Sequence, residues 1–286
     1  MAQTAGVGML VRLWKFINRT WRRLATGLCF AIFGIGGVIL SLTALPALKL
    51  ISAGNEELRQ ARARRLVQLT FRWFIGVMKW TGVFNFDFKA VEQLKQVKGQ
   101  VIIANHPCLI DVVALISFVP NPDCVVKSHL WKNPFMKGVI KSTGYLSNED
   151  PDELVKDCQE SLEQGCNLII FPEGTRTTPG EKIRFQRGAA HLALRTKAKV
   201  TALWVDCSPV TLIKNEMWYQ APKEKPTLSV HYLKEIDTQA YRDEEKLSIA
   251  ARHLTRDLQN FYEKVLQDDR QSENRDQAVD YRVVGS

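Results

Sequence analysis

The chain of 286 residues is long enough for one large domain or two small ones, and its 45% hydrophobic and 24% charged residues can form a buried core. Its six cysteines form no CxxC pair and no repeated spacing, which argues against a disulfide framework and for reduced thiols. The sequence contains no P-loop, HExxH, GxSxG or EF-hand pattern, so nucleotide, zinc, serine-hydrolase and calcium chemistry have no support.

The net charge of +9 is concentrated near the N-terminus. Residues 1–80 hold 12 Lys and Arg against 2 Asp and Glu, or +10, and the remainder holds 27 against 28, or −1. Such a basic end suits either nucleic acid or an anionic membrane surface. The residues between the charges favour a membrane, because nucleic-acid-binding arms do not carry a long uncharged apolar run. We therefore expect membrane lipid as a partner and no nucleic acid.

The apolar run at 24–48 has no charge over 25 residues. As a helix it would extend roughly 37 Å, enough for a hydrocarbon core of about 30 Å. Trp14 and Trp21 lie on the approach to it, where interfacial aromatic residues belong. A cleaved signal peptide is the main alternative, but its apolar region is shorter, about 7–15 residues. A buried helix of a soluble domain is a second alternative.

A second segment, residues 56–82, is basic in its first half and apolar in its second, where Arg72 and Lys79 interrupt it. This pattern favours a helix lying in the membrane interface over a second span. Both flanks of the apolar run are basic, so charge alone does not orient it. We prefer a hairpin that enters one leaflet, with residues 1–82 as anchor and the rest on the cytoplasmic face, at the inner membrane if the protein is bacterial.

From residue 83 onward, short apolar strands alternate with helices. Strands are predicted at 84–88, 100–105, 124–128, 167–171, 199–205 and 227–233, and helices at 109–119, 133–142, 151–164, 188–197 and 241–267. The alternation predicts an α/β fold, a mixed sheet flanked by helices, over residues 83–267. Residues 268–286 are polar and are predicted to form a disordered tail.

Two loops that follow predicted strands carry candidate functional residues, as loops at the carboxyl ends of strands usually do. In the first loop, "NHPCLID", Pro107 suits the first helical position and holds His106 outside the α region. Asp111, in the second helical turn, can reach back to one imidazole nitrogen and leave the other as a base. A purely structural His–Asp pair remains the alternative.

The second loop, "FPEGTR", combines a flexible glycine with a cation. Gly174 permits close approach of the backbone to a ligand, and the guanidinium of Arg176 offers a planar fork for phosphate. Further cations follow at Lys182, Arg184 and Arg187, before a helix whose N-terminus also favours anions. A solvated basic loop is the competing interpretation.

Together, "NHPCLID", "FPEGTR" and "RFQRGAAHLAL" resemble the glycerolipid acyltransferase family typified by 1-acylglycerol-3-phosphate acyltransferase, over roughly residues 83–233. The resemblance implies His106 as general base, Asp111 as the residue that orients it, and an acceptor site formed by Glu173, Gly174, Thr175 and Arg176. We add Lys127, Arg184 and Arg187 as candidate substrate-binding residues. It also implies acyl-CoA or acyl-carrier protein as co-substrate and a glycerolipid hydroxyl as acceptor, without a metal or other cofactor.

The chain also departs from the pattern of that family. Cys108 stands where serine is common, Ser147 and Asn148 replace an Asp-Arg pair, and Pro209 comes late in the last block. The missing arginine removes one phosphate ligand, so Arg184 or Arg187 substitutes for it or the acceptor is a lyso-aminolipid or specialised lipid. A non-catalytic membrane adaptor and a covalent acyl carrier at Cys108 are weaker alternatives.

Overall fold

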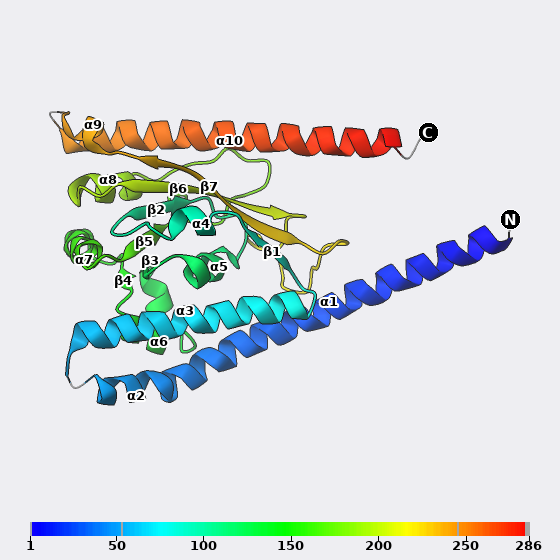
Figure 1. Ribbon diagram of the computed structural model, residues 1–286, viewed down its shortest axis with the longest axis horizontal. Helices are drawn as coiled ribbons and strands as arrows, with labels where there is room; N and C mark the ends of the chain where they lie inside the picture. The colour runs from blue at the N-terminus through cyan, green and yellow to red at the C-terminus, as the bar shows by residue number, and fades with distance from the viewer. Residues whose placement is uncertain (1, 53, 245, 284–286) are drawn as a thin grey trace.

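The computed structural model describes residues 2–52, 54–244 and 246–283, and its centre is a seven-stranded sheet with strand order β1-β7-β6-β2-β5-β3-β4 (Figure 1). The strands are β1 (Asn85–Phe88), β2 (Val101–Ala104), β3 (Pro122–Val126), β4 (Leu146–Ser147), β5 (Asn167–Ile170), β6 (Val200–Ser208) and β7 (Thr227–Ile236). Only β6 and β7 pair antiparallel, so the sheet is mixed, as predicted.

Helices cover both faces of the sheet, and β2 is buried throughout because it lies between them. Its alternate residues enter two separate cores. Ile102 and Ala104 pack on the side of α3 (Glu56–Trp80), α5 (Asp111–Phe118) and α6 (Lys137–Thr143). Val101 and Ile103 pack on the side of α7 (Pro151–Glu163), α8 (Gly188–Arg195) and α10 (Leu247–Val283). This explains the continuous apolar run of a strand covered on both faces.

The N-terminal segment forms two consecutive helices, α1 (Ala2–Leu42) and α2 (Ala44–Ile51), before the chain returns along α3 (Figure 1). The helical path is interrupted at Thr43, three residues before Pro46, whose nitrogen cannot donate to the carbonyl of Leu42. Within the described residues, one helical segment, Met9–Ile51, is long and apolar enough to cross a membrane.

Helix α3 packs on the α/β core, which the prediction of an interfacial helix did not include. Its residues Val67, Phe74 and Met78 are buried in the same cluster as residues of β2 and α5. The sequence pattern could not decide this, because an amphipathic helix presents the same apolar face to lipid and to protein. The outer face of α3 remains exposed at Trp73 and Trp80.

Helix α1 also packs on this core along part of its length. Ala25 and Cys29 are buried, and Gly37 lies so close to the turn before α6 that an added Cβ would be 2.7 Å from the carbonyl oxygen of Phe135. The opposite side of α1 exposes large apolar side chains, among them Leu24, Leu28, Ile35 and Ile39. The apolar run therefore has one face on protein and one face free.

The C-terminal part differs from the predicted helix at 241–267 and disordered tail at 268–286. A short helix, α9 (Gln239–Arg242), comes first, and α10 then continues to Val283. Residues 268–283 contain neither glycine nor proline, and most are tolerable helix formers, so a polar composition does not prevent a helix there. The last predicted tail residues, 284–286, lie outside the described residues.

Smaller differences occur around β3 and β4. The predicted helix at 133–142 starts later, at Lys137, because the side chain of Asn133 accepts a hydrogen bond from the nitrogen of Phe135 and forms a turn instead. A 3-10 helix, η1 (Ser128–Lys132), precedes that turn. The predicted helix after residue 150 is confirmed as α7, with Asp150 capping its first turn. The remaining short helix is α4 (Val91–Leu94).

Candidate active site

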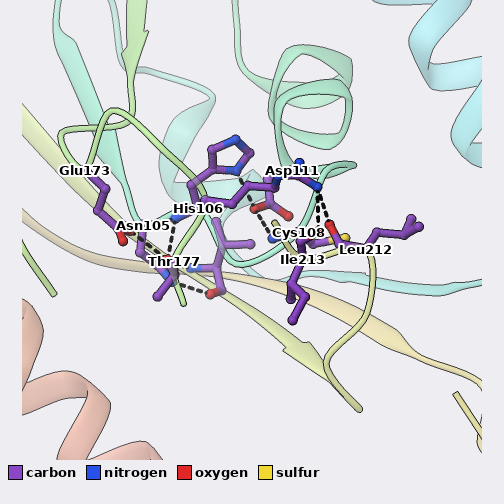
Figure 2. A network of polar contacts seen from close by, with 10 residues as sticks. Asn105, His106, Cys108, Asp111, Glu173, Thr177, Leu212 and Ile213 are labelled. Atoms are coloured by element: carbon purple, nitrogen blue, oxygen red, sulfur yellow. Dashed lines mark hydrogen bonds and ion pairs between the residues drawn. The ribbon is translucent and has the colours of Figure 1, made fainter. Parts of the chain in front are cut away.

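The parallel strands β2 and β5 are neighbours, so the loops at their carboxyl ends meet at one edge of the sheet. The β2 loop carries His106 and leads into α5, which begins at Asp111. The β5 loop carries Glu173 and Arg176. Figure 2 shows His106, Asp111, Glu173 and Thr177 converging there. The fold thus brings together the two motifs that the sequence separates.

His106 and Asp111 form the predicted pair. Nδ1 of His106 lies 3.0 Å from Oδ2 of Asp111, and the same oxygen accepts a hydrogen bond of 2.8 Å from the backbone nitrogen of Cys108. The second ring nitrogen, Nε2, points away from the carboxylate (Figure 2). The side chain of His106 is 15% exposed and that of Asp111 is 0% exposed. One imidazole nitrogen is therefore oriented by a buried carboxylate, and the other faces outward.

Burial and neighbouring charges act in opposite directions on the pKa of the Asp111 carboxyl group. Burial raises its pKa, although the hydrogen bond to His106 and the charges of His106 and Arg176 lower it. Among the described residues its second oxygen, Oδ1, has no hydrogen-bond partner. A carboxylate hydrogen-bonded to one ring nitrogen holds the imidazole in a fixed orientation.

Glu173 holds the backbone of His106 instead of pointing into solvent. Its Oε1 accepts hydrogen bonds from the nitrogen of His106 at 3.1 Å and from Oγ1 of Thr177 at 2.7 Å. The nitrogen of Thr177 in turn donates to the carbonyl of His106 at 2.7 Å. Burial raises the pKa of Glu173. Hydrogen bonds thus join the two motif loops at His106, the candidate general base.

Arg176 is partly engaged in the structure of the site. Its Nη1 donates to the carbonyls of Leu212 and Ile213 at 2.8 and 2.9 Å, in the loop after β6. The nitrogen of Leu109, three residues after His106, donates to the same carbonyl of Leu212 at 3.2 Å. Arg176 therefore fastens the β6–β7 connection to the site, in addition to any contact with an acceptor.

The other predicted acceptor residues surround this centre without touching it. Gly174 has φ +65, a left-handed conformation that glycine adopts readily, and it closes a turn in which its nitrogen donates to the carbonyl of Phe171. Thr175, Lys127, Arg184 and Arg187 are exposed. Lys127 follows β3 and lies on the same sheet edge as His106, whereas Arg184 and Arg187 come before α8.

Asn148 occupies the position where an arginine was expected. Its Oδ1 accepts a hydrogen bond of 3.0 Å from the nitrogen of Ser128, which links the end of β4 to the start of η1. An asparagine here can shape the corner next to Lys127, but it supplies no positive charge for a phosphate.

Three features of the site were not predicted. The ring of Phe171 stacks on His106 at 4.4 Å between centroids, and Thr177 bridges Glu173 and His106. Buried Asn105 exchanges two hydrogen bonds of 2.7 Å with Val205 in β6. Asn105 could have been found from its sequence context, since a polar residue ending a buried strand needs a partner.

Cys108 is fully buried beside the pair. A hydrogen bond with Cys207, together with burial, raises its pKa well above the usual range. A thiol in this state is a poor nucleophile because the thiolate is the reactive form. Burial and the raised pKa of Cys108 thus argue against the covalent acyl carrier considered from the sequence.

The chain is similar to known acyltransferases in sequence and in fold. Residues 85–206 match the family model described as Acyltransferase. The chain is 34% identical to a 1-acyl-sn-glycerol-3-phosphate acyltransferase of Helicobacter pylori over 109 residues, covering 36% of this chain and 46% of the relative. It is 23% identical to the human 1-acyl-sn-glycerol-3-phosphate acyltransferase beta over 177 residues, covering 58% and 61%. The matched parts thus span about half the length of these relatives.

Among solved structures, the chain resembles the 1-acyl-sn-glycerophosphate acyltransferase PlsC of Thermotoga maritima. The TM-score is 0.58 at 18% identity, over 82% of this chain and 96% of that chain, which shows a shared fold. The match of residues 85–206 defines an acyltransferase domain. Over these residues the chain is similar to acyltransferases whose names specify 1-acyl-sn-glycerol-3-phosphate.

Proposed function

We propose that this protein is a membrane-bound O-acyltransferase that moves an acyl chain from acyl-CoA or acyl-carrier protein to the hydroxyl of a lysophospholipid, with 1-acylglycerol-3-phosphate as the first candidate. The observation that carries the proposal is the contact of 3.0 Å between His106 and buried Asp111, at the sheet edge shared with the second motif loop. The names of its relatives support the choice of acceptor.

In the proposed reaction, Nε2 of His106 takes the proton of the acceptor hydroxyl as the oxygen attacks the thioester carbonyl. The tetrahedral intermediate then breaks its carbon–sulfur bond, and the thiolate of the donor leaves and takes up the proton. Asp111 orients the ring and stabilises the imidazolium that forms. No covalent bond to the protein is needed, which agrees with the raised pKa of Cys108.

We also propose that α1 and α2 lie in one leaflet without crossing the bilayer. Arg22, Ala25 and Cys29 of α1 are buried against the rest of the chain, so this stretch cannot be surrounded by lipid. The free side of α1 instead presents apolar side chains to the interface, and basic residues flank them. This supports the hairpin preferred from the sequence.

The direct experiment is an assay of the purified full-length protein in vesicles with acyl-CoA and 1-acylglycerol-3-phosphate, following free donor thiol and the diacyl product. Diacylglycerol phosphate, which lacks the free hydroxyl, is the control acceptor. Product formation that requires the free hydroxyl supports the proposal. Donor hydrolysis without acylated product, or no turnover with either acyl-CoA or acyl-carrier protein, contradicts it.

A second candidate keeps this chemistry with an acceptor that lacks phosphate, and Asn148 is the observation that favours it. Its amide is used to hold Ser128, at a position where an arginine would provide a phosphate ligand. A lyso-aminolipid compared with 1-acylglycerol-3-phosphate in the same assay separates the candidates by the ratio of kcat/KM. A preference for the lyso-aminolipid selects the second candidate.

A further inference from the structure

The segment between β6 and β7, residues 209–226 and here called the β6–β7 loop, connects the candidate active site to helix α1. At its beginning, the carbonyls of Leu212 and Ile213 accept hydrogen bonds from Arg176. At its end, the buried guanidinium of Arg22 donates to the carbonyls of Pro222, Lys223 and Glu224. Such charged hydrogen bonds to successive carbonyls fix the loop firmly at both ends.

Between these two attachments the loop exposes apolar side chains. Val210, Met217, Trp218 and Tyr219 are between 46% and 51% exposed, and the rings of Trp218 and Tyr219 meet edge to face at 5.5 Å. Tryptophan and tyrosine are the residues enriched where protein meets the headgroup region of a bilayer. A loop that faced only solvent would not be expected to expose several large apolar side chains together.

The apolar surface of the loop is continuous with that of α1. The ring of Trp218 lies over Gly27, where an added Cβ would be 2.8 Å from the ring. Leu24 and Leu28, next to Gly27 in α1, are among its exposed apolar residues. The free face of α1 therefore extends over Trp218 onto the loop.

At its other end, this surface approaches His106. Exposed Leu109, three residues after His106, donates its backbone nitrogen to Leu212 of the loop. Val210, which is also exposed, precedes Leu212 by two residues. Apolar side chains thus occur at intervals from α1 to the first motif loop.

Positive charges accompany the loop where it meets the helices. Lys225 lies near Lys79 and Arg22, and burial together with these two charges lowers its pKa. Exposed Lys223 is two residues away. Lys223 and Lys225, with Glu224 between them, lie beside exposed aromatic side chains, and lysines in this position are complementary to anionic lipid headgroups.

We propose that the β6–β7 loop is a second membrane-contacting element, which enters an anionic lipid surface through Met217 and Tyr219 and presents the lipid acceptor to His106. The inference rests on the proposed function for the identity of the acceptor, but the membrane contact does not. With this contact, the lipid acceptor passes along the loop from the bilayer to His106. The protein then contacts the membrane through the loop as well as through α1. Trp218 keeps the loop aligned with α1, and Arg176 keeps it aligned with the site.

The contact is tested with the full-length Tyr219→Cys variant carrying an environment-sensitive fluorophore. The native cysteines of the chain are all buried, so the label is directed to the new thiol. Lys156→Cys on α7, at the opposite end of the sheet from the loop in Figure 1, is the matched control. The vesicles contain phosphatidylcholine and phosphatidylglycerol in equal parts, and sedimentation measures binding separately.

With vesicles, the label at Tyr219→Cys is expected to shift its emission to the blue, to be quenched by brominated acyl chains, and to be protected from iodide. The label at Lys156→Cys is expected to change in none of these ways. Sedimentation of the protein with vesicles while the label at Tyr219→Cys stays accessible to iodide overturns the proposal. Since no turnover is measured, this result is independent of the acyltransferase assay.

The link to catalysis is tested with the double variant Met217→Ser, Tyr219→Ser. With acceptor embedded in vesicles, we expect its kcat/KM to fall about 10-fold, because part of the transfer free energy of two apolar side chains is lost. With a short-chain acceptor below its aggregation concentration, activity is expected to stay at the wild-type level. An equal fall with both acceptors overturns the delivery role and assigns the loop to folding of the site.

Discussion

The nitrogen Nδ1 of His106 lies 3.0 Å from Oδ2 of Asp111, a carboxylate that is 0% exposed. The two residues come from opposite ends of a short loop, His106 from the end of β2 and Asp111 from the first position of α5. Because burial raises the pKa of Asp111, its charge destabilises the folded state while serving the imidazole. The ionised carboxylate therefore supports catalysis at a cost in folding stability.

Asp111→Asn is expected to lower acyl transfer by about 10²-fold or more, because the amide no longer stabilises the imidazolium. Its effect on stability should depend on pH. The raised pKa means that the folded wild type binds more protons than the unfolded chain, so this group's contribution weakens as pH rises through its folded pKa. Asparagine does not titrate, so the stability of the variant does not fall with pH for this reason.

The measurement is urea unfolding of wild type and Asp111→Asn over a range of pH, in detergent. The free energy of unfolding of the variant relative to the wild type should increase as pH rises from acid to neutral. A relative stability that decreases with rising pH would mean that the ionised carboxylate stabilises the fold, contrary to the direction of its pKa.

Glu173 is predicted to act on His106 through a hydrogen bond and not through its charge. Glu173→Gln retains the acceptor oxygen and should keep activity within about 10-fold of wild type, whereas Glu173→Ala leaves the buried nitrogen of His106 with a weaker partner and costs about 1–3 kcal/mol. Kinetics and thermal unfolding of both variants check this. Equal losses in the two variants would point to a direct role for the charge at the acceptor.

Cys108 is predicted to be dispensable for chemistry. Cys108→Ser and Cys108→Ala should retain activity within a few-fold of wild type, because the buried thiol has a pKa well above its usual range and carries no acyl group. Steady-state rates and mass spectrometry of the protein mixed with acyl-CoA provide the check. An acyl adduct on Cys108, combined with loss of turnover in both variants, would establish the covalent route.

Arg22 is predicted to fix α1 to the domain, and the neighbouring Arg23 offers a control of equal charge. Arg22 is buried and donates to three carbonyls of the β6–β7 loop, whereas Arg23 is exposed. Arg22→Met should destabilise the protein by about 2 kcal/mol or more, since hydrogen bonds from charged groups contribute about 1.5–3 kcal/mol. Arg23→Met should change stability little. Indistinguishable melting temperatures for the two variants would contradict the tether.

Much of the α/β domain could be predicted from the sequence because its strands are short and buried. The runs at 101–104 and 168–170 are apolar on both faces, and they form adjacent parallel strands. The His106–Asp111 contact followed from a proline and from the direction of helical side chains. By contrast, the two-residue strand β4 has no periodic signal that could reveal it.

The remaining errors share a physical cause: sequence patterns identify an apolar face but not what covers it. The apolar face of α3 meets α5 and α6, although the same pattern suits a membrane interface. Likewise, the sequence could not show that Glu173 and Arg176 also form hydrogen bonds inside the protein, to His106 and Leu212. Those partners lie far away in sequence, so only the fold could reveal them.

The central claim is that one imidazole, oriented by Asp111, removes the acceptor proton. It is tested most directly by the rate of diacyl product formation in His106→Ala, with acyl-CoA and 1-acylglycerol-3-phosphate in vesicles. We predict a fall of about 10² to 10⁴ in kcat with an unchanged melting temperature, as for loss of a positioned base. Turnover within a few-fold of wild type in the folded variant would contradict the mechanism.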